Sequence, residues 1–424
     1  MPAARKGNTN RQLRAARKAK KDEFYTSRQV IEAELQWYRK DFIGRPVLCN
    51  CNDWPKDGFP RSEFVRFFMK KMASWNIPKL IAVGYQDSVG TLFEEGHGTL
   101  YVLENDGRPA DQPYTEDDFK VTELEGSGGF QTPECERLLD IPGVIVCTNP
   151  PFSGFRVFMG VLQAHHVGFL VLGNINAVAY KEIFPLFLNN QCWLGVSIHS
   201  GDRPFYVPDD YPLEAAGSGY DEDGHPYIRV KGVRWFTNLS GGRVGKNELS
   251  LEGNYYTGHE SEFPKYDDYD AINVNRVADI PIDYFGEMGV PITFLDKWAP
   301  QVDDTERERE RENGFASVRS DTSAVIRRTD TVWRNPCTFG ERRSSSVSSS
   351  NVPSRRKTPE WDGRTLGQEQ ADSDGTREIR PFPHPTFRLL GIANSARWIG
   401  RECLTIINGR RVHNRLIIQR TERL

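Results

Sequence analysis

The 424-residue sequence lacks any apolar run near the roughly 18 residues that a membrane-spanning helix needs. No apolar segment follows the positive charges at the N-terminus, so we expect no secretory leader. Positive and negative charges nearly cancel, with a formal net charge of −3, so overall charge gives no sign of a nucleic-acid binder. These absences predict a cytoplasmic protein that does not contact membranes. With 38% hydrophobic residues, the chain can form a large core.

The seven cysteines form no metal-binding pattern. One residue separates Cys49 from Cys51, whereas zinc sites have a two-residue spacing and a second pair of ligands. Several of the other cysteines fall in apolar segments. We therefore expect buried free thiols in a reducing compartment, and no bound metal.

Composition divides the chain into segments. Residues 1–21 contain eight Lys or Arg and no acid, which fits either a solvated, disordered terminus or a basic arm that lies on phosphates. Residues 302–380 contain a Glu–Arg run, a serine-rich stretch and few aliphatic residues, which predicts a disordered insertion. Order is expected to return at residues 381–424, with a hairpin that turns at Asn408-Gly409.

Short buried-strand patterns alternate with helical patterns between residues 47 and 197. This alternation is typical of βαβ units and predicts an α/β fold with a doubly wound, mostly parallel sheet in residues 22–200. Because ligands bind at the carboxyl ends of such strands, polar residues there are candidates for a site. These residues are Asn52 and Asp53, Asn149, and Asn174 with Asn176.

The region 201–301 is richer in turns and acidic residues at its start. Within it, residues 228–236 alternate apolar and basic side chains, which predicts one half-exposed strand. Arg229 and Lys231 are expected on one side, with Arg234 as a further candidate. Two interpretations fit this pattern, a solvated strand face and a contact with a DNA backbone.

The most informative stretch is Asn149-Pro150-Pro151-Phe152, which follows an apolar strand at 144–148. Two prolines fix φ near about −65° and remove two backbone donors, and Asn149 is pushed out of the helical region. The result is a rigid hook that presents the Asn149 amide, the Pro150 carbonyl and the Phe152 ring. Two acceptors can hold both hydrogens of a planar amino group while the ring stacks on its face. An ordinary Asn-Pro turn is the alternative.

Several blocks in order resemble the EcoRI-type adenine-specific DNA methyltransferases over roughly residues 22–300. The blocks are residues 22–26, 47–53, 148–153, 173–185, 230–238, 266–275 and 289–297. The resemblance implies a Rossmann-like, S-adenosylmethionine-dependent fold with an appended target-recognition region at 201–301. It implies S-adenosylmethionine as the methyl donor and N6 of adenine in double-stranded DNA as the acceptor, in bacterial restriction-modification. A cognate restriction endonuclease would act at the same DNA site without contacting this chain.

The resemblance also assigns residues. The motif of the catalytic hook carries over onto Asn149, Pro150, Pro151 and Phe152. Tyr25 and Thr26 match the segment that approaches the methionine end of the donor. The usual glycine-rich loop after the first strand is absent, and the segment ending in Asn52 and Asp53 stands there instead, which makes these two residues the further donor-binding candidates.

Two other functions compete with this one. The first is an RNA or protein-glutamine methyltransferase with the same hook, although the basic arm and the large region after residue 200 favour a nucleic acid. The second is a DNA-binding protein with a decayed donor site. It is motivated by the segment Gly126-Ser-Gly-Gly-Phe130, which has no acidic residue directly before Phe130 and lacks the spacing of a phosphate-binding loop.

Overall fold

The computed structural model describes most of residues 25–300 and parts of residues 386–421. The described residues are 25–53, 62–86, 96–199, 201–207, 213, 217–222, 224–244, 246, 249, 251, 254–267, 269–300, 386–393, 406–408, 410–411 and 415–421. The predicted basic arm at 1–21 and the predicted insertion at 302–380 lie outside these residues. None of the helices in the described segments is long and apolar enough to cross a bilayer.

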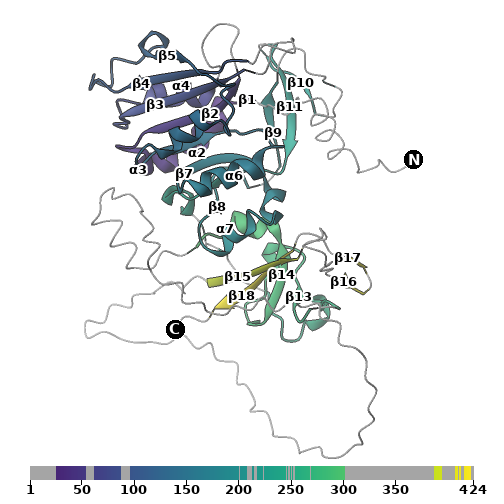
Figure 1. Ribbon diagram of the computed structural model, residues 1–424. Helices are drawn as coiled ribbons and strands as arrows, with labels where there is room; N and C mark the ends of the chain where they lie inside the picture. Colours follow the sequence, from purple (N-terminus) through teal and green to yellow (C-terminus); the bar gives the residue numbers. More distant parts are fainter. Residues whose placement is uncertain are drawn as a thin grey trace, which may run out of the picture.

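An eight-stranded sheet organises the larger part of the molecule (Figure 1). Its four central strands, β3-β2-β6-β7, are parallel, and the strands outside them pair in antiparallel fashion. This arrangement confirms the α/β class, with the parallel part at the centre of the sheet. The strands in spatial order are β5 (Lys120–Glu123), β4 (Thr99–Glu104), β3 (Lys79–Tyr85), β2 (Val47–Asp53), β6 (Ile145–Thr148), β7 (Gly168–Asn174), β12 (Val233–Thr237) and β8 (Trp193–Leu194).

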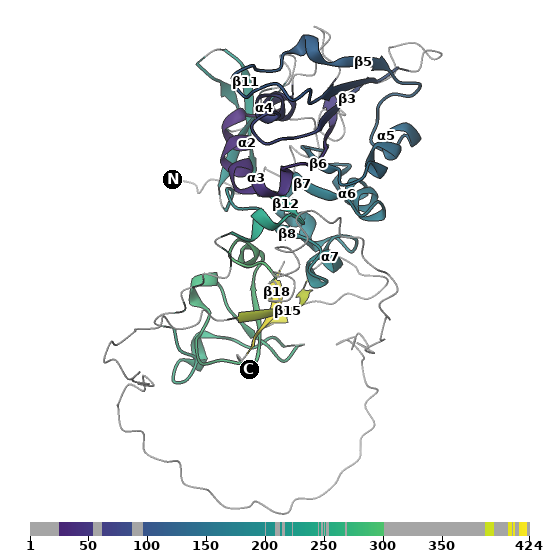
Figure 2. The ribbon, with the colours of Figure 1, turned by 90° about the vertical axis from the view of Figure 1, so that its left-hand side faces the viewer.

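Helices cover both faces of this sheet (Figure 2). The α-helices are α2 (Arg28–Leu35), α3 (Arg39–Phe42), α4 (Glu63–Lys71), α5 (Pro133–Arg137), α6 (Phe155–Ala164) and α7 (Phe184–Leu188). Short 3-10 helices are η1 (Gln36–Tyr38), η2 (Glu116–Asp118), η3 (Leu138–Asp140), η4 (Ile175–Ala179), η5 (Ser240–Arg243), η6 (Glu260–Glu262), η7 (Val277–Asp279) and η8 (Ile292–Asp296). Figure 2 shows α2, α3 and α4 on one side of the sheet and α5 and α6 on the other.

Alternation along each strand builds the two cores. Successive side chains of a strand point to opposite faces, so neighbouring residues of β2 enter different clusters. Cys49 packs with α2 and α4, whereas Leu48 packs with α5, α6 and α7. Helix α6 fits its side because Phe155, Phe158, Met159 and Leu162 recur at helical spacing and are all buried. The doubly wound arrangement therefore follows from strands that are apolar on both faces.

A second, smaller sheet has the order β1-β9-β11-β10. Its strands are β1 (Tyr25–Thr26), β9 (Asp202–Tyr206), β11 (Pro226–Lys231) and β10 (Gly219–Tyr220). One face carries Phe205, Ile228 and Val230, which are buried in the cluster shared with α2 and α4. The small sheet is therefore packed against the large one through a common core.

The single strand predicted for residues 228–236 is wrong, because Gly232 breaks it. Gly232 has φ of 75°, a conformation that favours glycine, and it separates β11 of the small sheet from β12 of the large sheet. Arg234 consequently does not share the exposed side with Arg229 and Lys231. It is 3% exposed and lies in β12, which pairs with β7. The large sheet thus extends past the predicted boundary at residue 200.

A third sheet, in the order β13-β14-β18-β15, lies beside α7 in both views (Figures 1 and 2). Its strands are β13 (Ile272–Asn273), β14 (Glu287–Pro291), β18 (Arg415–Thr421) and β15 (Thr386–Ala393). The predicted hairpin forms only from β16 (Ile406–Ile407) and β17 (Arg410–Arg411). The residues of β18, expected to complete that hairpin, pair with β14 and β15 instead.

A buried ion pair joins the third sheet's region to the large sheet. Arg234 donates from Nε and Nη2 to the two carboxylate oxygens of Asp296, at 2.6 and 2.9 Å. Nη2 also donates to the carbonyl of His199, and the Lys246 ammonium donates to the Asp296 carbonyl at 2.7 Å. Burial lowers the pKa of Lys246 to about 8. Because all donors of the pair have partners, the contact fixes η8 against β12.

Candidate active site

The site lies where the chain changes direction across the large sheet. From β2 the chain continues to β3 on one side, and from β6 it continues to β7 on the other. Crevices in open α/β sheets form at this switch point, outside the carboxyl ends of the two central strands. Here the two ends are the segment after Cys49 and the hook that begins at Asn149. The fold therefore places the hook at the position where such sheets bind ligands.

The end of β2 is kinked away from regular strand geometry. Cys51 has φ of 60°, unusual for a residue other than glycine, and the pairing of β2 with β3 shifts register between Cys49 and Asn52. The ladder between β2 and β6 reaches only Leu48 and Val146. Beyond it, the Thr148 hydroxyl donates to the Asn50 carbonyl and ties the two ends together. Both residues lie in segments that resemble the family, but no sequence pattern singles out either of them as a buried polar group.

The hook forms a tight turn into α6. The Gly154 N–H donates to the Pro151 carbonyl at 2.9 Å, which closes the turn. No described residue donates to the Pro150 carbonyl, which is therefore available to a ligand. Asn149 is half-buried and Pro150 is buried. Both predicted acceptors of the amino group thus stand next to each other at the end of β6.

Phe152 is held by the core and is only 8% exposed. Its cluster includes Cys147 of β6 and Phe205 of β9. Across the small sheet, Phe205 pairs with Thr26, and Thr26 is 5% exposed. The packing thus links the predicted catalytic ring, through Phe205, to the strand that carries the two predicted donor-binding residues Tyr25 and Thr26.

Tyr25 and Thr26 point to opposite faces of the small sheet, as successive strand residues must. Thr26 shares the inner face with Phe205, whereas Tyr25 is in register with Tyr206 on the outer face. Only one side chain of the predicted pair therefore faces the core. The other two predicted donor-binding residues, Asn52 and Asp53, end β2, and their side chains lie outside the described part of the chain.

The glycine-rich loop is packed tightly beside the end of β3. A Cβ at Gly128, which has φ of 76°, would lie 2.6 Å from the Gly84 carbonyl, so no larger residue fits there. The Glu134 carboxylate accepts from the backbone N–H groups of Glu125 and Gly126 at 3.1 and 2.8 Å. These donors cannot also hold a phosphate. The Glu134 side chain thus holds the loop by its backbone.

The loop and the hook meet at Phe130. This ring packs edge-on against Phe158 of α6, with centroids 5.1 Å apart. A Cβ at Gly154 would lie 3.6 Å from the same ring, so Phe130 also covers the turn that follows the hook. Two segments more than twenty residues apart therefore form one wall at the carboxyl edge of the sheet.

Two buried oxygen atoms at this edge fit the polar groups of S-adenosylmethionine. Thr26 Oγ1 and Asn50 Oδ1 have no partner among the described residues, and their residues are 5% and 3% exposed. Buried oxygens without partners are costly and point to a ligand or water that completes them. Both border the cluster of Phe152, through Phe205 and Cys49. The residues present therefore suit a donor rich in amino and hydroxyl groups.

Other polar or ionisable groups near the edge have structural roles or are inert. Asn174 Oδ1 accepts from the Asn176 N–H at 3.0 Å, and its Nδ2 donates to the Lys231 carbonyl at 3.1 Å. Burial raises the pKa of the Cys49 and Cys147 thiols, so neither is a thiolate at neutral pH. Among the described residues, no group of three or more His, Cys, Asp or Glu could hold a metal ion.

Comparisons with known proteins agree with this geometry. A family model described as "Adenine-specific methyltransferase EcoRI" matches residues 12–332. The type II methyltransferase M.EcoRI of Escherichia coli is 39% identical over 299 residues, which cover 69% of this chain and 87% of the relative. M.MpnI of Mycoplasma pneumoniae is 38% identical over 291 residues, covering 68% and 82%.

A third type II methyltransferase, M.MgeORF184P of Mycoplasma genitalium, is 35% identical over 290 residues, covering 68% of this chain and 82% of its own. No solved structure matches the chain. The matched region spans the hook, the kinked end of β2 and the small sheet. The chain therefore belongs to the EcoRI family of adenine-specific methyltransferases and is a methyltransferase of the type II, restriction-modification class.

Proposed function

We propose that the chain methylates N6 of adenine in duplex DNA at a specific sequence, as the modification enzyme of a restriction-modification pair. The observation that carries the proposal is the hook at the switch point. It sets the Asn149 amide beside a Pro150 carbonyl that no described residue occupies. A cognate endonuclease would act on the same DNA site without contact. Membership in the family supports the adenine acceptor.

The hook would hold the exocyclic amine of adenine by its two hydrogens. The Asn149 amide oxygen accepts one and the Pro150 carbonyl accepts the other, which draws the nitrogen toward tetrahedral geometry and frees its lone pair. No strong base is needed, because the methylated ammonium is acidic and loses its proton to water. Orientation and fixed dipoles then supply most of the rate.

An adenine paired inside a duplex cannot reach the hook, so the base must leave the stack. Unstacking costs a few kcal/mol, which contacts in the pocket offset. Phe152 would contribute by stacking. Its 8% exposure means that the ring is held by the core and offers only a limited surface to the base. Pro151 fixes the backbone that carries this ring.

S-adenosylmethionine supplies an electrophilic methyl group when bound. Thr26 Oγ1 and Asn50 Oδ1, both buried and without described partners, are the oxygens that we assign to its polar groups. Tyr25, Asn52 and Asp53 remain proposed donor-binding residues on the strength of the family resemblance. This buried pair of oxygens argues against a decayed donor site, because a lost ligand would leave them without compensation.

The test is methyl transfer from radiolabelled S-adenosylmethionine to unmodified duplex DNA. Asn149→Ala should lower the rate at least about a hundredfold, because it removes an acceptor of the reacting amine. Asn149→Asp keeps an acceptor oxygen and should retain more activity than the alanine variant. Asn189→Ala, which removes an exposed amide at the end of α7, should behave as wild type.

Three results would contradict the proposal. Near wild-type transfer by Asn149→Ala would exclude the hook as the amine-binding group. Transfer to RNA or to protein glutamine in place of DNA would identify the competing acceptor. Absence of saturable donor binding in calorimetry, with DNA binding intact, would identify a DNA-binding protein without methyl transfer.

A further inference from the structure

The outer face of the small sheet carries three tyrosines in one row. Tyr206 of β9 pairs with Tyr25 of β1 on one side and with Tyr227 of β11 on the other. Directly opposed residues in a sheet point to the same side, so the three rings stand together across three strands. All three are half-buried, whereas Phe205 and Ile228 on the opposite face are buried in the core. This row is the face that the described core leaves uncovered.

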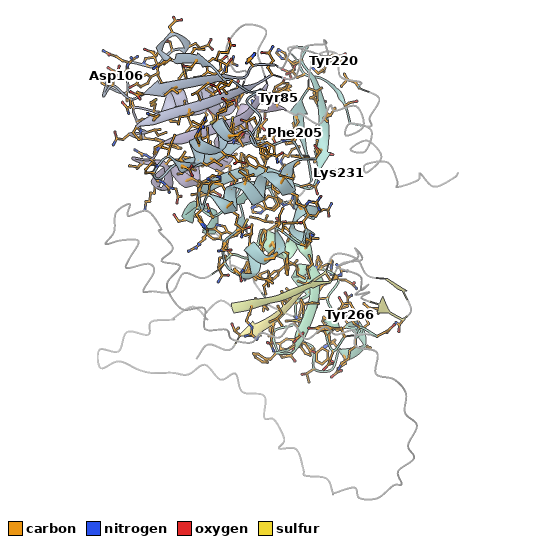
Figure 3. All side chains as sticks on the ribbon, viewed as in Figure 1. Tyr85, Asp106, Phe205, Tyr220, Lys231 and Tyr266 are labelled. Carbon is orange, nitrogen blue, oxygen red and sulfur yellow. The ribbon has the colours of Figure 1, made fainter. Side chains whose placement is uncertain are left out.

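Two cations continue this face along β11. Arg229 and Lys231 alternate with the buried Ile228 and Val230, and both are exposed. Arg229 is paired with Asp202 at 3.0 Å, which keeps the guanidinium extended over the sheet. Lys231 makes no ion pair with a described residue. Figure 3 shows Lys231 and Tyr220 at opposite ends of the small sheet.

The position of Lys231 relates this face to the candidate active site. Its backbone carbonyl accepts from Asn174 Nδ2 at 3.1 Å, and the next carbonyl, of Gly232, accepts from the Ile175 N–H at 2.7 Å. Asn174 is the last residue of β7 and Ile175 follows it, and β7 is the strand beside β6 and its hook. The basic end of the sheet therefore lies beside the carboxyl end of β7, at the edge of the large sheet that carries the hook.

Charge is graded along the sheet. The turn between β10 and β11 carries Asp221 and Glu222, at the end opposite Lys231. Asp221 is occupied by the backbone and ring of His225, at 2.8 and 3.4 Å. An anionic polymer would accordingly be drawn to the half of the face that carries Arg229 and Lys231, which is the half that contacts the end of β7.

Chain connectivity adds positive charge at the edge of the same sheet. Tyr25 in edge strand β1 follows a segment with eight Lys or Arg among residues 1–21. A duplex nucleic acid, whose negative charge extends over several helical turns, could contact the cations of residues 1–21 as well as Arg229 and Lys231.

We propose that the row of Tyr25, Tyr206 and Tyr227, with Arg229 and Lys231, is a docking surface for the sugar–phosphate backbone of DNA at the rim of the active site. Cations neutralise phosphates, and tyrosine hydroxyls donate to phosphate oxygens. The contact positions the duplex and carries no base information. The proposal rests on the proposed DNA acceptor.

The test uses the full chain and a fluorescent 30-base-pair duplex of mixed sequence, with affinity measured by anisotropy between 50 and 200 mM salt. Each lost phosphate contact makes the slope of log affinity against log salt shallower by about 0.9. Between 50 and 200 mM salt, the fall in the affinity of Lys231→Gln should therefore be about threefold smaller than the fall for wild type. For the double variant with Arg229→Gln and Lys231→Gln, the fall in affinity should be about tenfold smaller than for wild type. Lys120→Gln, at an exposed position of edge strand β5, should match wild type.

A variant of opposite sign sharpens the test. Asp202→Asn removes the negative charge that pairs with Arg229 on this face, so it should tighten DNA binding. Tyr227→Phe keeps the ring and the packing and should weaken binding in proportion to one hydroxyl contact. Donor affinity, measured by calorimetry, should stay at the wild-type value in all these variants. Unchanged donor affinity would show that the donor-binding site is still folded.

If the double variant has the same salt slope and the same donor affinity as wild type, then the docking surface is wrong. That result would leave the proposed methyl transfer to DNA standing. Weaker binding by Asp202→Asn would overturn it as well. If the wild-type chain binds the donor but no DNA, then both the docking surface and the proposed acceptor fall. If the double variant loses the donor, then the Lys231→Gln and Asp202→Asn measurements, with their opposite signs, decide.

Discussion

At the scale of residues, the site combines a motif that sequence analysis could find with buried atoms that it could not. Asn149 and Pro150 stand out in any sequence because two prolines fix the backbone around them. Thr148 and Asn50 carry no such mark. Their hydrogen bond exists only because β2 and β6 are neighbours, although the residues lie 98 positions apart in the chain.

Asn50 offers a direct test of the buried oxygens. Replacing Asn50 by Leu keeps the volume and removes an oxygen without a described partner. The donor-free protein should therefore lose no stability, because a buried unpaired polar group is costly. Donor affinity should fall roughly two- to tenfold, the value of one hydrogen bond, in a calorimetric titration.

Asn189→Ala, at an exposed end of α7, is the control for this titration. Unchanged donor affinity in Asn50→Leu would remove Asn50 from the donor site. A large loss of thermal stability in the donor-free variant would give its amide a structural role instead.

At the scale of elements, the positions of the main strands along the chain could be predicted from the sequence, but the pairing of strands within the sheets could not. The apolar segments at 47–51, 79–84 and 168–173 each form a parallel strand, because uninterrupted apolar runs suit strands that are buried on both faces. The split at Gly232 was missed. An alternating pattern continues through it, and only the positive φ of the glycine shows that β11 and β12 belong to different sheets.

The Arg234–Asp296 pair should hold η8 onto β12. Its side chains are 4% and 6% exposed, and removing one partner leaves an uncompensated buried charge. Asp296→Asn should therefore lower the free energy of unfolding by about 3–5 kcal/mol, measured by chemical denaturation. The exposed pair of Arg276 with Asp279 is the matched control, and Asp279→Asn should leave the denaturation midpoint nearly unchanged.

Equal effects of the two aspartate substitutions would contradict the structural role of the buried pair. A second possible result separates folding from function. If Asp296→Asn unfolds in two transitions while wild type unfolds in one, then the pair couples the third sheet to the large sheet.

At the scale of the whole molecule, three sheets share continuous cores. The small sheet packs on the α2–α4 side of the large sheet, and the third sheet packs on the α7 side. The sequence predicts an α/β domain that ends near residue 200 and is followed by a recognition region, whereas the large sheet includes β12 from beyond residue 200. Such pairings join distant parts of the chain, and local patterns carry no information about them. Assignment of residues 201–301 to target recognition remains a prediction.

The central claim is that this chain places a methyl group on N6 of adenine in DNA. Its most direct test is methylation-sensitive sequencing of DNA from cells that express the wild-type chain or Asn149→Ala. The account predicts N6-methyladenine at one recurring sequence in cells with the wild-type chain, and none above background with the variant. The account would be contradicted if adenine stayed unmodified in cells that contain folded wild-type chain. It would also be contradicted if cells with Asn149→Ala carried the same modification.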